Sequence, residues 1–207
     1  MTTHDHGHGH RRGRDIGHHD WLSADYVRGW IEGDVTKDDT RRPLLLRMLE
    51  LAPFGADDPI SVLDVGGGYG IVSSVVLTAF PNATLTLQDY SAPMLKQAKT
   101  RLAAFGERVR FEQRDFTVEG WTDGLGGPFD LAVSGIAIHN LGSRGPIASV
   151  YRAVCGALKP GGAFLDLDYA GFTGGIEQHL QWMRDGGFTR VENPWEEQSQ
   201  SAMAAYR

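Results

Sequence analysis

Short apolar runs alternate with longer stretches of helical spacing along most of this chain. Each apolar run is too short for a globular helix and rich in β-branched residues, so it predicts a strand. In the longer stretches apolar residues recur three and four positions apart, which predicts helices with one buried face. Strands are expected at about 60–65, 83–88, 109–113, 129–134, 163–168, 188–192 and 203–206. Helices are expected at about 69–80, 92–105, 143–158 and 176–184.

Two further helices are expected within residues 21–55, ahead of the first strand. Ser23 is a good N-cap for the first of them, and Gly33 ends it. The second runs over about 40–51, with a proline near its first turn. The first helix and its approach carry three aromatic residues, Trp21, Tyr26 and Trp30. Two interpretations of these aromatics stay open, packing in a core and contact with a substrate.

The first 20 residues hold six of the eight histidines, interleaved with Gly, Arg and Asp, and offer almost nothing that a core could bury. We therefore expect a disordered tail over 1–20 and a single domain over 21–207. The alternating histidines, and Thr2-Thr3-His4 if Met1 is removed, would suit weak binding of a transition metal such as Cu(II) or Ni(II). A solvated tail without a function is the alternative. Elsewhere we find no convincing ligand set for a required metal.

Composition narrows the class of protein. At 207 residues the chain fits one domain with a full core and leaves no room for a second catalytic domain. Its formal net charge of −6 argues against a broad nucleic-acid or anionic-membrane surface. Small-molecule partners are therefore expected, with no nucleic acid and no membrane. A single cysteine, the lack of any run of roughly 18 apolar residues and the lack of an apolar leader predict a cytoplasmic protein.

The strand at 60–65 runs into four glycines, at positions 66, 67, 68 and 70, where the next helix begins. Glycine removes the Cβ where a backbone turns sharply and lies against a ligand. The N-terminus of a helix adds free N–H groups and a partial positive charge, which suit a carboxylate or a phosphate. A dinucleotide-binding turn would need glycine at position 71, where Ile71 stands. The turn therefore predicts a ligand site with a different spacing.

Asp64 followed by G-x-G-x-G at positions 66, 68 and 70 resembles the first motif of the class I S-adenosylmethionine-dependent methyltransferases. The Lys-Pro-Gly-Gly turn at 159–162 is a second marker of that family, and the resemblance covers about 60–207. It implies a three-layer α/β/α Rossmann-like core over 60–207, with a mostly parallel seven-stranded sheet whose last strand is antiparallel. The alternation of strands and helices with short links independently favours a doubly wound sheet.

The resemblance also implies where S-adenosylmethionine is bound. Asp89 ends the second strand 19 residues after Gly70, and a carboxylate there suits two charge-assisted hydrogen bonds to a ribose diol. In the family, an acidic residue at Asp115 accepts from the adenine amino group and its neighbour touches the ring. The full set of cofactor-binding residues that we expect is Asp64, Gly66, Gly67, Gly68, Gly70, Asp89, Tyr90, Met94, Asp115, Phe116 and Ser134.

The chemistry is expected just after the fourth strand, at 135–141. The cofactor brings its own electrophile and leaving group, so the protein must align a nucleophile with the methyl group. His139 is the candidate catalytic base, because the reference pKa of imidazole near 6.5 suits proton removal at neutral pH. The alternative is that His139 and Asn140 hold the loop by hydrogen bonds. Cys155 falls within a predicted helix and is expected to be a buried structural thiol.

We therefore expect an enzyme that transfers a methyl group from S-adenosylmethionine to a small-molecule O, N or C acceptor by direct in-line displacement. Ser134 and the three residues after it differ from the acidic or amide residue, two prolines and aromatic of the amino-methylating nucleic-acid enzymes. Two alternatives remain. One is a nicotinamide-dependent oxidoreductase, and the other is a non-enzymatic nucleotide-binding protein that responds to metal through its histidine-rich tail.

Overall fold

The computed structural model describes residues 19–142 and 144–207. The expected disorder of the histidine-rich tail and its expected binding of a transition metal concern residues that lie almost entirely outside this description. Among the described residues, no helix has both the length and the apolar character that crossing a membrane requires.

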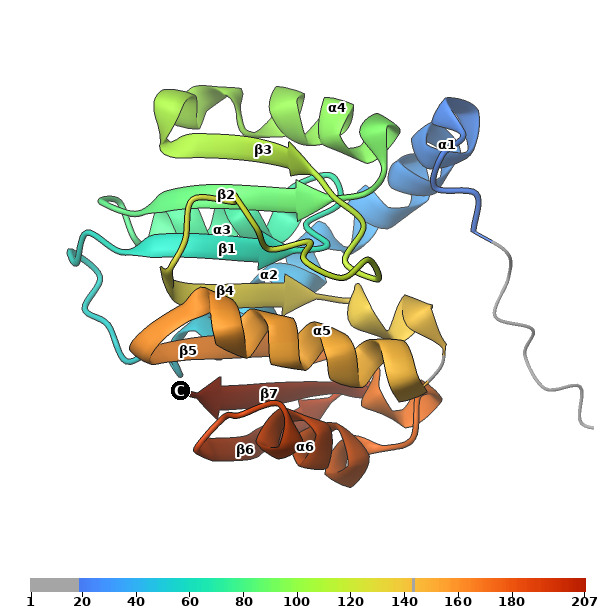
Figure 1. Cartoon of the computed structure of the whole chain (residues 1–207). Coiled ribbons are helices and arrows are strands. Elements are labelled where there is room, and N and C mark those ends of the chain that lie inside the picture. Colours follow the sequence, from blue (N-terminus) through green and yellow to red (C-terminus); the bar gives the residue numbers. More distant parts are fainter. Residues whose placement is uncertain (1–18, 143) are drawn as a thin grey trace, which may run out of the picture.

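Seven strands form one sheet in the order β3-β2-β1-β4-β5-β7-β6 (Figure 1). Neighbouring strands run parallel, except that β7 is antiparallel to both β5 and β6. This is the expected mostly parallel sheet with an antiparallel last strand. The strands are β1 (Ser61–Val65), β2 (Thr84–Asp89), β3 (Val109–Gln113), β4 (Phe129–Gly135), β5 (Leu158–Asp168), β6 (Arg190–Glu197) and β7 (Gln200–Tyr206).

Helices cover both faces of the sheet, which gives the expected three layers (Figure 1). Side chains alternate between the two cores, as strand geometry requires: in β1, Val62 packs on the α2 and α3 side, whereas Leu63 and Val65 pack on the α5 and α6 side. The helices are α1 (Ala24–Asp34), α2 (Asp38–Leu49), α3 (Ile71–Ala79), α4 (Ala92–Arg101), α5 (Arg144–Ala157) and α6 (Ile176–Asp185). Short 3₁₀ turns are η1 (Val35–Lys37), η2 (Ala103–Arg108), η3 (Ile138–Leu141) and η4 (Ala170–Phe172).

Some element boundaries differ from those expected. The helix predicted over 92–105 ends at Arg101 and continues as the 3₁₀ turn η2. The strand predicted from 163 begins at Leu158, and residues 159–162 bulge out of it, because Leu158 pairs with Phe129 while the next pair joins Ala163 to Leu131. The backbone of this bulge is held by two hydrogen bonds to Arg207. The glycine-rich turn therefore lies within β5 instead of preceding it.

The helices ahead of the sheet are fastened to the glycine turn by a buried ion pair. Asp34, at the end of α1, is 3% exposed and accepts hydrogen bonds from both terminal nitrogens of Arg41, at 2.7 and 2.8 Å. The hydroxyl of Tyr69, which follows Gly68, donates to the same carboxylate at 2.9 Å. Burial acts to raise the pKa of Asp34, but the hydrogen bonds and charge of Arg41, helped by Tyr69 and Lys37, lower it below its ordinary value.

Replacement of Asp34 by Asn is therefore expected to cost about 3–5 kcal/mol of folding free energy, because the guanidinium of Arg41 stays buried without its counter-charge. Asp25→Asn is the matched control, since Asp25 pairs with Arg28 at 2.7 Å on the exposed face of the same helix. Such an exposed pair contributes about 1 kcal/mol or less.

Urea unfolding at pH 7 measures both losses, and equal losses would contradict this account of the ion pair. Because the pKa of Asp34 is lowered in the folded state, its contribution is present above the ordinary aspartate pKa. It is lost as the pH falls through the lowered value, so the deficit of Asp34→Asn should shrink in acid.

Candidate active site

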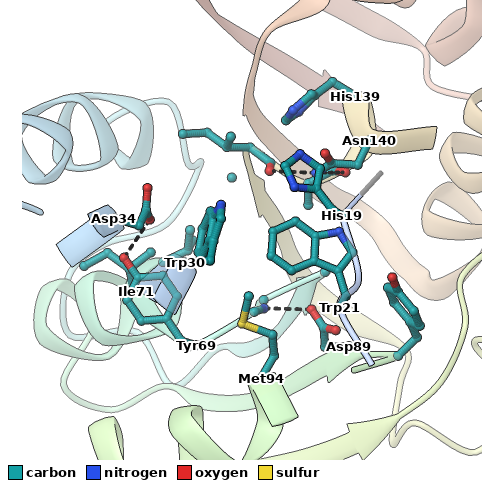
Figure 2. A pocket seen from close by; sticks show the side chains of 18 of the residues that line it. His19, Trp21, Trp30, Asp34, Tyr69, Ile71, Asp89, Met94, His139 and Asn140 are labelled. Atoms are coloured by element: carbon teal, nitrogen blue, oxygen red, sulfur yellow. Dashed lines mark hydrogen bonds between the residues drawn. The ribbon is translucent and has the colours of Figure 1, made fainter. Parts of the chain in front are cut away.

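A cavity of about 690 Å³ opens at the carboxyl ends of β1, β2 and β4. This is the edge where ligands meet an open parallel sheet. Three parts of the chain line it: the segment from His19 through α2, the glycine turn, and the loops that follow β2, β3, β4 and β5. Figure 2 shows side chains from these separate segments turned toward one space, with Asp89 and His139 on opposite sides of Trp21 in that view.

The glycine turn needs its glycines for two reasons. Gly66, Gly68 and Gly70 have φ of +64°, +53° and +85°, a region that side-chain-bearing residues rarely adopt. A Cβ on Gly66 would also lie 2.8 Å from the Cβ of Ala137 in the loop after β4. At Gly68 a Cβ would meet nothing within 4 Å, and since Gly68 lines the cavity, that open space belongs to the cavity.

Asp89 is held in place from two sides. Its Oδ2 accepts from the N–H of Gly68 at 2.9 Å, and its Oδ1 accepts from the N–H of Ser91 at 2.8 Å. Asp89 is 8% exposed and lines the cavity, and each carboxylate oxygen keeps a lone pair for a ligand. Burial raises the pKa of Asp89, while the backbone N–H groups around it act in the opposite direction. Ser91 also caps α4 by accepting from the N–H of Met94, as expected.

Most of the expected cofactor-binding residues line this single cavity. They come from the turn after β1 and the loops after β2 and β3, and comprise Gly66, Gly67, Gly68, Asp89, Tyr90, Met94, Asp115 and Phe116. Asp115 is exposed, and its Oδ1 is engaged by the backbone N–H and hydroxyl of Thr117. Its orientation is therefore fixed locally, with Oδ2 left for a ligand.

Three expected cofactor-binding residues, Asp64, Gly70 and Ser134, do not reach the cavity. Asp64 and Ser134 are fully buried within their strands. Asp64 accepts from the hydroxyl of Ser73 at 2.5 Å, and burial raises its pKa to about 7, with the charge of Asp89 adding to the rise. Gly70 lies close to Leu102, because the turn is already passing into α3. The structure thus places these residues beneath the site and not on its surface.

His139 lies on the side of the cavity away from Asp89 (Figure 2) and is paired with a buried aspartate. Its Nδ1 lies 2.6 Å from Oδ1 of Asp168, and its backbone N–H donates to Oδ2 of the same residue at 2.9 Å. Asp168 ends β5, is fully buried and also accepts from the N–H of Tyr169. Within the described part of the chain, the ring makes hydrogen bonds through Nδ1 only. Asp168 therefore selects the Nδ1–H tautomer and leaves the Nε2 lone pair for a ligand.

The loop that carries His139 is strained. Ile136 has φ of +55°, which is an outlier for a β-branched residue, and its N–H donates to the carbonyl of Leu167 at 2.9 Å. Such strain persists only where the surroundings determine it, and it is commonly found at functional sites. Ala137 in this loop lies directly against Gly66 of the glycine turn.

An aromatic wall from the N-terminal segment closes another side. It consists of His19, Trp21, Trp30 and Tyr69, each ring in contact with the next at centroid distances of 4.7, 5.0 and 6.0 Å. The hydroxyl of Ser91 donates to the carbonyl of Trp21, which fastens this wall to the start of α4. The aromatic pattern had left both a core and a pocket role open for Trp21 and Trp30, and both residues line the cavity.

Sequence reasoning missed a polar group at the same wall. Asp34, Lys37 and Arg41 line the cavity beside Tyr69, and none of them belongs to a motif. The only sequence signal was that Asp34 directly follows the predicted end of the first helix at Gly33, and the sequence alone does not show that it is buried. No group of three or more His, Cys, Asp or Glu residues suited to a metal occurs within 19–142 and 144–207.

Comparison with known proteins agrees with this geometry. A family model described as "Methyltransferase domain" matches residues 63–164. The chain is 38% identical over 104 residues to the release factor glutamine methyltransferase of Chlorobaculum tepidum, an alignment covering 48% of this chain and 35% of that protein. It is 39% identical over 98 residues to the malonyl-[acyl-carrier protein] O-methyltransferase of Neorickettsia risticii, covering 47% and 34%.

Among solved structures, an O-methyltransferase family protein from Burkholderia thailandensis aligns with a TM-score of 0.71 at 18% identity, covering 91% of this chain and 60% of that one. Human N-acetylserotonin methyltransferase in complex with SAM aligns with a TM-score of 0.64 at 16% identity, covering 89% and 55%. At these identities the structural likeness concerns the fold.

The fold, the glycine turn and the family match together define the class: residues 63–164 belong to a methyltransferase domain of the S-adenosylmethionine-dependent type, and S-adenosylmethionine is its cofactor. The chain spans about a third of the length of the first curated relatives that it matches, 35% and 34%. The acceptor therefore has to be argued from this chain's own cavity.

Gly68→Ala tests whether the turn touches the cofactor. The new methyl group enters the cavity and should lower affinity for S-adenosylhomocysteine about tenfold or more, because overpacking a filled site costs about 1–3 kcal/mol. Gly161→Ala is the matched control, because its φ is +81° and a Cβ would again meet nothing within 4 Å. It lies near the start of β5, at the opposite end of the parallel strands from the cavity. Both variants should lose about 1–2 kcal/mol of stability from the left-handed backbone. Calorimetry showing equal affinities would remove Gly68 from the site.

Proposed function

We propose that this chain transfers the methyl group of S-adenosylmethionine to a small-molecule nucleophile by direct in-line displacement. The observation that carries the proposal is one cavity with two chemically different sides. One side offers the glycine turn, Asp89 and Asp115, and the other offers His139 paired to Asp168. A cavity of about 690 Å³ falls within the range of small-molecule sites, which are largely apolar with a few placed polar groups.

The residues of the first side fit S-adenosylmethionine. The carboxylate of Asp89 keeps lone pairs for the two ribose hydroxyls, and Asp115 keeps Oδ2 for the adenine amino group. Met94 and Phe116 offer apolar surface for the ring. The open space at Gly68 would let the bound cofactor lie close to the backbone of the glycine turn. When bound, the cofactor supplies an electrophilic methyl group on a sulfonium that leaves as a neutral thioether.

The second side would position and activate the acceptor. Positioning a nucleophile at near-attack distance can supply on the order of 7–11 kcal/mol of the barrier. His139 would take the proton of the acceptor at Nε2, while the Asp168 carboxylate stabilises the imidazolium that forms. A base is needed only where the nucleophile must lose a proton, so this pair suits an acceptor such as a hydroxyl.

The acceptor is proposed to be small because the N-terminal segment encloses it. Trp21 and Trp30 line the cavity, and the carbonyl of Trp21 accepts a hydrogen bond from the hydroxyl of Ser91 at the start of α4. The curated relatives carry names that refer to a release factor, a malonyl-[acyl-carrier protein] and ribosomal RNA, so similarity alone does not identify the acceptor. The enclosure by these rings supports a planar or apolar small molecule over a macromolecular loop.

The direct test is an assay of S-adenosylhomocysteine release across a library of small hydroxylated, aminated and carbon-acid metabolites. Turnover with at least one of them, abolished when S-adenosylmethionine is omitted, is the expected result. Turnover confined to protein or RNA substrates would overturn the small-molecule acceptor while leaving methyl transfer intact.

His139→Gln is expected to lower kcat/KM about 100-fold or more, the usual contribution of a general base, with affinity for S-adenosylhomocysteine kept within about threefold. Asp168→Asn should lower it as well, because the tautomer of His139 is no longer fixed. Asp130→Asn is the control aspartate, since Asp130 accepts from Ser61 and Lys159 at the start of β4, away from the cavity. A kcat/KM for His139→Gln within about threefold of wild type would exclude the base role.

A further inference from the structure

Five polar side chains form a network in the α5 and α6 layer, directly behind the loop that carries Tyr169. We call it the buried network; it consists of Ser134, Tyr151, Asp166, Thr173 and His179. Four of these side chains are fully buried and Thr173 is 6% exposed. None of them lines the cavity, so the reaction proposed above does not use them directly. Polar groups buried to this degree are costly unless their hydrogen bonds are complete.

The hydrogen bonds run in one direction through the network. The hydroxyl of Tyr151 donates its only proton to Oδ2 of Asp166, at 3.2 Å. It must therefore accept from Nδ1–H of His179, which lies 2.6 Å away. Nε2 of His179 then accepts from the hydroxyl of Thr173 at 2.7 Å, a much shorter contact than the 3.5 Å between that hydroxyl and the carbonyl of Ala170. This assignment makes His179 neutral, in agreement with its burial, which lowers its pKa although the charge of Asp168 acts in the opposite direction.

The chain of bonds leaves two buried atoms without a partner. They are Oδ1 of Asp166 and the hydroxyl oxygen of Ser134. The two residues pair with each other across β4 and β5. The hydroxyl of Ser134 can serve this carboxyl group in either state, as a donor to an ionised Oδ1 or as an acceptor from a protonated one, so the charges around Asp166 decide its state.

Asp166 and Asp168 share one face of β5, being two residues apart, and are both fully buried. Their surroundings differ. Asp168 accepts two backbone N–H groups and the imidazole of His139, which suits an ionised carboxylate. Asp166 faces only the hydroxyls of Ser134 and Tyr151 and, among the described residues, no cation. The charge of Asp168 on the same face disfavours a second charge nearby, and of the two carboxyl groups Asp166 has the weaker support for ionisation.

Burial, reinforced by the charge of Asp168, raises the pKa of Asp166 well above its ordinary value, and the hydroxyls of Tyr151 and Ser134 only partly oppose this. The titratable groups that face Asp166 are thus Asp168 on its own strand, Tyr151 on α5 and, through Tyr151, His179 on α6. The raised pKa of Asp166 agrees with the few hydrogen-bond donors that its carboxyl group faces.

We propose that Asp166 stays protonated at neutral pH and is a positioning residue, which leaves Asp168 as the single negative charge behind His139. The buried network also anchors the turn η4 through Thr173, and with it Tyr169 at the cavity. A second charge at Asp166 would favour the imidazolium of His139 and oppose its action as a base. That functional consequence rests on the proposed function, whereas the protonation of Asp166 does not.

Asp166→Asn tests the protonation. The amide is neutral, its oxygen can accept from Tyr151 and its NH₂ can donate to Ser134, so every bond of the buried network is kept. Unfolded aspartate has a pKa of about 3.9, so the wild-type protein must take up a proton at Asp166 in order to fold at higher pH. A raised folded pKa gives a contribution that is fully present below the unfolded value and is lost as the pH rises. Asp166→Asn has no ionisable group at this position, so its stability does not fall in this way as the pH rises.

The expected result is a Tm for Asp166→Asn that exceeds the wild-type value by about 4 °C or more at pH 8, with a gap that narrows toward pH 5. Asp168→Asn, the paired comparison on the same strand, should lower Tm at both pH values. A pH-independent gap, a lower Tm for Asp166→Asn at pH 8, or failure of this variant to fold would each overturn the proposal, because a neutral amide reproduces every bond it assigns.

A second readout follows His139 itself by NMR titration of the histidine ring signals, assigned with a His139→Gln sample. If Asp166 is already neutral, Asp166→Asn leaves the titration midpoint of His139 unchanged. A midpoint that falls in the variant would mean that a negative charge was removed, which contradicts the proposal. Neither measurement requires turnover, so failure of the proposed methyl transfer and failure of this inference are distinguishable.

Discussion

The hydrogen bond between the N–H of Gly68 and the carboxylate of Asp89 joins the two strands on which the site is built. It holds the turn after β1 against the end of β2 at 2.9 Å, and it requires a backbone that only glycine adopts readily. Gly66 then allows the loop after β4 to approach within contact of the same turn. The cavity therefore exists because three strand ends converge on a backbone without side chains.

The aromatic wall, on the side proposed to hold the acceptor, is also connected to this glycine turn. Tyr69 follows Gly68 and donates to Asp34, whose pairing with Arg41 fastens α1 and α2 to the core. Trp30 lies against Tyr69, and Trp21 lies against Trp30. Displacement of the turn would thus shift the aromatic wall as well. The same turn therefore connects the proposed cofactor and acceptor sides, as a reaction that needs a nucleophile aligned with a methyl group requires.

Much of the fold followed from local patterns. Buried β-branched runs and helical spacing located all seven strands and the helices flanking them, because a parallel sheet with both faces covered has an unambiguous apolar signal. Boundaries were less well predicted where tertiary bonds extend an element, as the contacts of Arg207 do for β5. The family, the cofactor and the three layers were also predicted, through the resemblance of the glycine turn and the 159–162 turn to a known family.

The residues of the site could be predicted only in part from the sequence. Asp89 and Gly68 stand at motif positions and line the cavity, whereas Asp64 in β1 and Ser134 in β4 face the interior. Spacing alone does not show which way a residue points near the end of a strand. Arg41 and Asp34 come from outside any motif. The pairing of His139 with Asp168 joins residues 29 positions apart through the β4 and β5 register, which no local pattern encodes.

The most direct measurement is a crystal structure of the chain with S-adenosylhomocysteine. The account predicts that the ribose hydroxyls bind the carboxylate of Asp89 and that the sulfur faces the space between His139 and the wall of Trp21 and Trp30. A complex in which Asp89 is remote from the sugar, or in which the sulfur points away from His139, would contradict it.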